Sequence, residues 1–284
     1  MLFDPECIPC IINQAYNAAK LFTNGSKELQ FKIVKDACEA VLTIDGDSSA
    51  PMFSSVIQNS IEKTLGVVNP YQKLKEENLI KAKRFIKYLE TMVESSEDKL
   101  ESAVCAAIIG NTIDLGANPN FDIEAEVNKI TSNNIDETTF RRFKEDLKKA
   151  SSVLYIGDNY EEALFDKILI KQMLPRKIVF AVRSKPILND ITLIDAKHLE
   201  IDKICEVMES GSSIAGTDLK QCSKKFRELF GQAGLVLAKG QGNFETLLYT
   251  HRPVYFLFKV KCEAIARRCG FPVGSSVLYL NNKN

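Results

Sequence analysis

The chain has 284 residues, 45% of them hydrophobic and 26% charged, which is an ordinary composition for a soluble globular protein. Basic and acidic residues number 37 each, so no net field favours nucleic acid or a membrane surface as a partner. The apolar runs are shorter than the ~18 residues that a membrane span needs. The start, MLFDPECIPC, lacks the basic and apolar regions of a signal peptide. We therefore expect a cytoplasmic protein.

The first half, residues 1–150, has the pattern of a helical domain. Apolar residues recur at helical spacing in segments 12–22, 28–44, 54–67, 69–95, 99–116 and 138–150. Segment 121–134 is polar and weakly patterned, and we interpret it as a connection. The helix predicted at 28–44 carries one apolar face, formed by Phe31, Val34, Cys38, Val41 and Leu42.

The second half, residues 151–284, alternates short apolar runs with helical patterns, as βα units do. The runs VLYI, KIVFAV, LVLA and VYFLF are continuously apolar, which is typical of parallel strands buried on both faces. We expect an open α/β layer with a mainly parallel sheet here, next to the helical domain.

Polar residues follow each predicted strand. In chain order they are Asp158 and Asn159; Arg183, Asn189 and Asp190; Lys239, Gly240, Asn243 and Glu245; and Lys259, Lys261 and Cys262. In an open α/β sheet, ligands bind at the carboxyl ends of the strands, near the point where the strand order reverses. These loops are therefore expected to converge on one site.

Asp158, Asn159 and Asp190 supply hard oxygen donors, which suit Mg²⁺ or Mn²⁺ better than zinc. Two alternatives remain open for them. Asn159, three residues before Glu162, resembles a helix capping box, and Asp190 is a candidate cap for the helix that follows it.

The segment KGQGNFETL places glycines and Lys239 where a strand leads into a helix. Such a loop can bind phosphate through its backbone amides and a lysine, or it can simply be a tight βα turn. Combined with the oxygen donors, it indicates metal-assisted phosphoester hydrolysis, in which the metal binds the phosphate and activates a water. Asp158 and Lys239 are then the catalytic candidates.

Several segments together resemble a known family. They are CIPCIINQA, NPYQKLK, GNTIDLG, GDNYEEALFDK, VRSKPILNDITLIDA, GSSIAGT, LAKGQGNFETL and KVKCEAIA, and they span nearly the whole chain. The resemblance is to the ARMT-like damage-control phosphatases, once called domain of unknown function 89, and among them to the prokaryotic branch that carries a CxxC.

The resemblance implies a helical region packed on a Rossmann-like α/β/α core. It implies a phosphatase that uses Mn²⁺, Co²⁺, Ni²⁺ or Mg²⁺ and acts on small phosphorylated metabolites such as sugar phosphates. The family's metal ligands correspond to Asp158, Asn159 and Asp190, and its phosphate-binding lysine to Lys239.

Other residues are candidates for substrate binding or for a second site. We expect substrate contacts from Asn111, Asp114, Arg183, Lys239, Gly240, Asn243 and Glu245, although Asn111 and Asp114 also suit a cap or an interhelical hydrogen bond. Cys7, Cys10 and Cys262 are candidates for a soft-metal or redox site, or are simply buried cysteines.

Two other functions compete with the phosphatase. One is an S-adenosylmethionine-dependent carboxyl methyltransferase, which needs a glycine-rich loop after the first strand, where this chain has the single glycine of GDN. The other is a phosphometabolite-binding protein without catalytic activity.

Overall fold

The computed structural model describes residues 3–45, 48–112 and 135–281. Segment 121–134 and Asp114 lie outside the described residues, so the expectations about them stay untested. The first half forms α1 (Cys7–Phe22), α2 (Lys27–Val41), the 3-10 turn η1 (Ala50–Met52), α3 (Phe53–Leu65), α4 (Gln72–Ser95), α5 (Lys99–Thr112) and α7 (Glu137–Lys149).

The second half alternates strands and helices, as predicted. Its elements are β1 (Ser152–Ile156), α8 (Ala163–Met173), β2 (Lys177–Val182), α9 (Leu193–His198), η2 (Ile201–Lys203), β3 (Glu206–Glu209), α10 (Lys224–Gln232), β4 (Leu235–Lys239), α11 (Gln241–Leu247), β5 (Tyr255–Lys259), α12 (Glu263–Cys269) and β6 (Ser276–Leu280).

The described strands form one sheet in the order β3-β2-β1-β4-β5-β6. Neighbouring strands from β3 to β5 pair in parallel, and β6 pairs antiparallel with β5. The sequence pattern did not predict β6, because a return strand without a crossover helix breaks the βα alternation. The strand order reverses between β1 and β4, so the switch point lies at the carboxyl ends of these two strands.

Strands β1, β2, β4 and β5 bury both of their faces, whereas the edge strand β3 exposes Glu206 and Glu209. Val153 and Tyr155 of β1 belong to one hydrophobic core, and Leu154 and Ile156 belong to another on the opposite face. Successive side chains of a strand point to opposite faces, and both faces are buried here, so these strands are continuously apolar in sequence.

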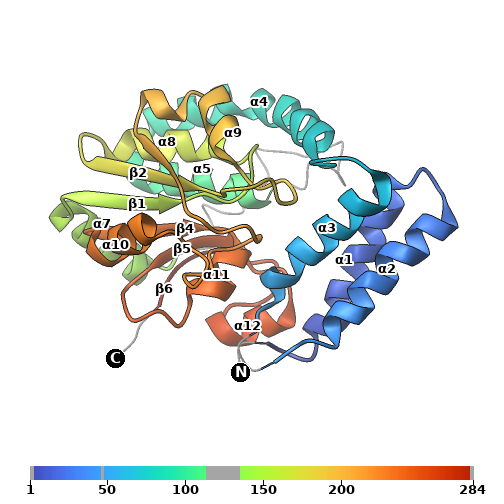
Figure 1. Ribbon diagram of the computed structural model, residues 1–284. Helices are drawn as coiled ribbons and strands as arrows, with labels where there is room; N and C mark the ends of the chain where they lie inside the picture. Colours follow the sequence, from blue (N-terminus) through green and yellow to red (C-terminus); the bar gives the residue numbers. More distant parts are fainter. Residues whose placement is uncertain (1–2, 46–47, 113–134, 282–284) are drawn as a thin grey trace.

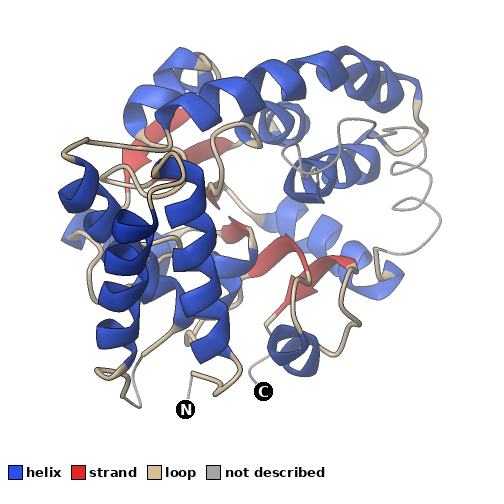
Figure 2. Cartoon of the chain, turned by 90° about the vertical axis from the view of Figure 1, so that its right-hand side faces the viewer, coloured by secondary structure: helices blue, strands red, loops and turns tan. Residues whose placement is uncertain are grey.

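Helices cover both faces of the sheet, which gives the expected three-layer α/β/α arrangement. Residues of α4, α5, α7, α8 and α9 pack in one core, and residues of α10, α11 and α12 pack in the other. Viewed from the side, the strands pass between helices (Figure 2).

Helices α1, α2 and α3 stand together beside the sheet and have a core of their own (Figure 1). The helices α4, α5 and α7, which also precede residue 150, instead share the core of the sheet. The helical region therefore contributes both a separate three-helix unit and a covering layer.

The apolar face expected on α2 is not the face that this helix buries. Ile33 and Ala37 are buried against α1 and α3, whereas Phe31 and Leu42 are 75% and 85% exposed. The interpretation was wrong for Phe31, Cys38 and Leu42, because the stripe formed by Ile33, Ala37, Ala40 and Val41 packs against the core instead. None of the described helices is both long and apolar enough to cross a membrane.

Candidate active site at the strand-order switch

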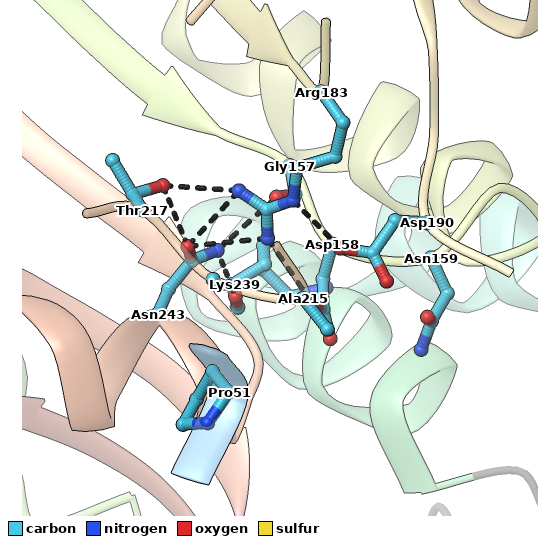
Figure 3. A network of polar contacts seen from close by, with 12 residues as sticks. Pro51, Gly157, Asp158, Asn159, Arg183, Asp190, Ala215, Thr217, Lys239 and Asn243 are labelled. Carbon is cyan, nitrogen blue, oxygen red and sulfur yellow. Dashed lines mark hydrogen bonds and ion pairs between the residues drawn. The ribbon is translucent and has the colours of Figure 1, made fainter. Parts of the chain in front are cut away.

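The loops after β1 and β2 run side by side at the switch point and bring three predicted residues together. Asn159 and Asp190 form an isolated antiparallel bridge, and the main-chain nitrogen of Ile191 donates to the main-chain oxygen of Asp158 at 2.8 Å. Asp158 and Asn159 thus lie next to Asp190, although Asp158 and Asp190 are 32 positions apart in sequence (Figure 3).

Neither Asn159 nor Asp190 caps a helix. Helix α8 begins after Glu162 without a side-chain cap, and the amide of Asn159 instead donates to the Glu162 carboxylate at 2.6 Å. Helix α9 is capped by Thr192, in a capping box with Asp195. The capping interpretation is therefore wrong for both residues.

The Asp158 carboxylate is buried in a polar setting that it shares with other acids. Its Oδ2 lies 3.3 Å from the Asn111 amide nitrogen, and its Oδ1 lies 3.7 Å from the Arg183 guanidinium. Burial, together with the nearby carboxylates of Glu162 and Asp190, raises the pKa of Asp158 well above its usual value. A neighbouring positive charge would therefore stabilise the ionised form.

Arg183 anchors Asp190 and does not line the cavity described below. Its Nε donates to Asp190 Oδ2 at 2.6 Å, and its terminal nitrogens donate to Thr217 Oγ1 at 3.0 Å and to Asn243 Oδ1 at 3.2 Å (Figure 3). With only 1% of its surface exposed, this guanidinium fixes the loop geometry around Asp190. Burial nevertheless raises the pKa of Asp190, although Arg183 acts in the opposite direction.

A second cation, Lys75 of α4, supports the same loop from the other side. Its ammonium donates to the main-chain oxygen of Asp190 at 3.0 Å and to the Asp195 carboxylate at 2.5 Å. This buried lysine was missed in sequence, because its position in a charged helix looks like that of the exposed lysines around it.

Lys239 is fully buried and faces helix α8. Its ammonium lies 2.7 Å from Asp166 and 3.5 Å from Glu162, and Tyr155 OH donates to the same Asp166 oxygen at 2.6 Å. Burial by itself lowers the pKa of Lys239, but the Asp166 and Glu162 carboxylates raise it above its usual value. Lys239 is thus part of a buried network of ion pairs with Asp166 and Glu162, next to the Asp158 side of the site.

Two buried asparagines join the surrounding elements to the site. The amide nitrogen of Asn111 donates to both Glu162 oxygens at 3.0 Å, and its oxygen accepts from the main-chain nitrogen of Lys259 at 3.0 Å. Asn243 donates to the main-chain oxygens of Gly157 and Lys239 at 3.1 and 2.7 Å. These contacts hold the ends of β1, β4 and β5 in register beneath the carboxylates.

The glycine-rich loop has a steric reason for its glycines. Gly240 adopts φ +81°, and a Cβ there would lie 1.9 Å from Asp158 Oδ2. A Cβ on Gly242 would lie 2.0 Å from the main-chain oxygen of Ala215. The loop therefore accommodates the catalytic carboxylate candidate and the 211–217 segment at close range.

A cavity of about 220 Å³ opens over this site. It is lined by Gln14, Ala50, Pro51, Ser54, Asp158, Asn159, Leu188, Asn189, Asp190, Ala215, Gln241, Gly242, Glu245 and Lys261. Of the predicted site residues, the three oxygen donors and Glu245 line it. Asn111, Arg183, Lys239, Gly240 and Asn243 lie around or beneath it.

Sequence reasoning placed Lys261 in a loop at this edge of the sheet but assigned it no role, whereas in the structure it is exposed and lines the cavity. It missed other residues of this wall. Gln14 and Ser54 come from the three-helix unit, so only the tertiary packing brings them here. Ser54 Oγ accepts from the main-chain nitrogen of Ala215 at 2.9 Å, which ties α3 to this edge of the sheet.

Glu161 and Glu162, which immediately precede α8, are buried beside the cavity. Glu161 Oε1 accepts from Asn189 at 3.0 Å and from Asn78 at 3.3 Å, while its Oε2 has no hydrogen-bond partner among the described residues. Burial raises the pKa of Glu161 to about 7. The site is thus richer in carboxylates than the sequence motifs suggested.

Comparison with known proteins agrees with this architecture. The sequence model of the damage-control phosphatase ARMT1-like domain matches residues 3–277. An uncharacterized protein of Methanocaldococcus jannaschii is 36% identical over 96% of this chain and 94% of its own length. A damage-control phosphatase of Pyrococcus horikoshii is 32% identical over 97% of both chains.

A further relative and a solved structure extend the match. A damage-control phosphatase of Archaeoglobus fulgidus is 30% identical over 98% of both chains. The crystal structure of a DUF89 family protein from Pyrococcus horikoshii superposes with a TM-score of 0.88 at 30% identity, and covers 99% of both chains. The chain therefore belongs to the damage-control phosphatase ARMT1-like domain family.

Proposed function

We propose that this protein is a divalent-metal-dependent phosphatase that hydrolyses small phosphorylated metabolites in the cavity at the strand-order switch. The observation that carries the proposal is the composition of the cavity wall. Asp158, Asn159 and Asp190 offer oxygen donors on one side, and the Lys261 ammonium offers a positive charge in the same cavity. A divalent metal ion and an ammonium group together suit a phosphate group, because both neutralise its negative charge.

The buried charges around the cavity fit a cation. Among the described residues, six carboxylates are buried against three basic side chains. The acids are Asp158, Glu161, Glu162, Asp166, Asp190 and Asp195, and the bases are Lys75, Arg183 and Lys239. Buried carboxylates without a counter-charge are costly, and a divalent cation would supply one.

The donor set must include the amide of Asn159. Across the described ranges, no three His, Cys, Asp or Glu side chains are grouped so that they could hold a metal ion. The Asn159 nitrogen is engaged by Glu162, so its side-chain oxygen is the atom available to join the carboxylates of Asp158 and Asp190. Three hard oxygens suit Mg²⁺, Mn²⁺, Co²⁺ or Ni²⁺.

When bound, such an ion draws charge from phosphate oxygens and lowers the pKa of a coordinated water. The residues of the chain hold the phosphate against it. We assign that role to Lys261, whose main-chain nitrogen donates to Gln241 Oε1 at 2.9 Å and whose side chain lines the cavity. Lys239, the lysine expected in this role, supports the Asp158 side of the site from below through Glu162 and Asp166.

The rest of the wall suits a small polar metabolite. Gln14, Ser54, Asn189 and Gln241 present uncharged polar groups, which can exchange hydrogen bonds with hydroxyls. A volume of about 220 Å³ is below the 300–1,000 Å³ of typical drug-sized sites. Sugar phosphates fit this size and polarity better than nucleotides do.

The test is phosphate release from a panel of sugar phosphates with Mn²⁺, Co²⁺ or excess EDTA. We expect activity that needs metal and a loss of about 100-fold in Asp158→Asn, since that variant removes a charge from the transition-state environment. Lys261→Met should raise KM for the phosphate ester, whereas Lys185→Met, an exposed lysine that does not line the cavity, should leave it unchanged.

A readout that does not need turnover completes the test. Calorimetry should show Mn²⁺ binding to the unmodified chain and weakened binding in Asp158→Asn and Asp190→Asn. Full activity in EDTA, or an Asp158→Asn variant as active as the parent, would refute the proposal. Metal binding and ligand-induced melting shifts without any phosphate release would favour a binding protein.

A further inference from the structure

Two of the three cysteines that the sequence singled out, Cys10 and Cys262, contact residues that line the same cavity. Cys7 and Cys10 are in the first turn of α1, and Cys262 precedes α12. All three are free thiols, with Cys10 exposed and the other two partly buried. The structure gives them no metal-binding arrangement with other His, Cys, Asp or Glu side chains in the described chain.

Two glutamines of the cavity wall connect the thiols to the site. Gln14 Nε2 donates to Cys10 Sγ at 3.4 Å, and Gln241 Nε2 donates to Cys262 Sγ at 3.9 Å. Both glutamines line the 220 Å³ cavity. Cys10 and Cys262 therefore flank one cavity, one from the three-helix unit and one from the sheet domain.

Ion pairs hold the two segments together at this point. Arg267 of α12 lies 3.1 Å from Asp4 and 3.0 Å from Glu6, immediately before α1. Cys10 is close enough to Cys262 to contribute to the raised pKa of the latter, after burial and Glu245. The segment before α1 and helix α12 thus form one junction, beside which Cys10 and Cys262 each contact a glutamine of the cavity wall.

We propose that Cys10 and Cys262 are a redox modification site, at which a peroxide converts the two thiols to a disulfide that joins α1 to the loop carrying Lys261. The exposed Cys10 reacts first. Its sulfur takes one oxygen of hydrogen peroxide as the O–O bond breaks, which gives a sulfenic acid and one water.

Cys262 then resolves the sulfenic acid. Its sulfur attacks the Cys10 sulfur, the S–S bond forms, the S–O bond breaks, and the leaving hydroxide takes a proton to give the second water. The two thiols lose two electrons in total, and the peroxide gains them. Burial raises the pKa of the Cys262 thiol, which suits the second role better than the first.

Cys7 is a less suitable partner. Its side chain packs against the core of the three-helix unit, whereas the exposed Cys10 contacts Gln14 of the cavity wall. Although Cys7 and Cys10 form the CxxC, the geometry points to the long-range pair as the product. The bond would restrain Lys261, the neighbour of Cys262 in sequence, and so would link the cavity cation to the redox state.

The experiment treats the full-length protein with hydrogen peroxide, blocks the remaining thiols with iodoacetamide and maps disulfides by peptide mass spectrometry. We expect a Cys10–Cys262 linked peptide that dithiothreitol removes. Cys38→Ser, which changes an exposed cysteine of α2, and Cys7→Ser should both keep the link, whereas Cys10→Ser and Cys262→Ser should lose it.

The result does not depend on phosphatase activity, so it stands apart from the proposed function. A linked peptide in the unmodified protein supports the proposal even if a variant fails to fold. Absence of any Cys10–Cys262 link, or a Cys7–Cys10 link in its place, overturns it.

Discussion

Replacing Gly240 by alanine adds one methyl group directly against the Asp158 carboxylate. The new Cβ would lie 1.9 Å from Asp158 Oδ2 and 2.2 Å from its Cγ. Ordinary contact begins at 3.4 Å, so the carboxylate has to move by the difference, about 1.5 Å. The backbone adds strain, because φ +81° with ψ 156° is a region that essentially only glycine adopts.

Two effects of different size follow. The backbone strain costs about 1–3 kcal/mol of unfolding free energy. A shift of about 1 Å in a reacting group can cost about 100-fold in rate, so we expect the displaced Asp158 to lower kcat by at least that factor. Urea unfolding measures the first effect, and metal-dependent phosphate release measures the second.

Two glycines provide matched controls. Gly66→Ala places alanine at φ +66° with no atom within 4 Å, so it carries the backbone strain without any clash. Gly231→Ala lies in α10 with open space around it, and should be neutral or slightly stabilising. If Gly240→Ala folds and keeps a kcat within threefold of the parent, the contact between this loop and Asp158 has no catalytic importance.

Three further changes probe the buried network. Asn111→Ala removes hydrogen bonds to two site carboxylates. It should lower the free energy of unfolding, measured with urea, by about 1–3 kcal/mol, and should weaken Mn²⁺ binding, measured by calorimetry, by about 10–100-fold. Lys75→Met leaves the buried Asp195 carboxylate without its cation, so it should lower the free energy of unfolding by about 3–5 kcal/mol. Adding Asp195→Asn should restore part of that loss, and a double variant whose loss equals the sum of the two single losses would contradict the pairing. Lys239→Met should cost a similar amount, about 3–5 kcal/mol, because Asp166 loses its cation; an unchanged unfolding free energy with a raised KM would instead show that Lys239 binds substrate.

The position of the site was predictable because of how parallel strands end. Their carboxyl ends meet at one edge, so polar residues after successive apolar runs are expected to converge. Asp158, Asn159 and Asp190 do lie together at the point where the strand order reverses. The βα alternation likewise predicted β1, β2, β4 and β5, since each is apolar on both faces, whereas the edge strand β3 has exposed glutamates at both ends and no such run.

The direction of each side chain was decided by tertiary packing. Lys239 is the last residue of β4 and shares the face of Leu235 and Leu237, which pack under α5 and α8, so its ammonium meets Asp166 of α8. Lys261 lies in the next strand's loop and reaches the cavity. The segments LAKGQGNFETL and KVKCEAIA, which contain these two lysines, carry no information on which face of the sheet the helices cover.

Other features depended on contacts between segments far apart in the chain. Helix α5 packs over the sheet and so brings its Asn111 into contact with Asp158 and Glu162. The three-helix unit supplies Gln14 and Ser54 to the cavity wall. The sequence by itself determined the helices of the first half, the four apolar strands and the sheet edge at which the oxygen donors lie, because these follow from local periodicity and strand direction. Only the tertiary structure decided which charges face the cavity and which are buried behind it, because that depends on how the helices pack over the sheet.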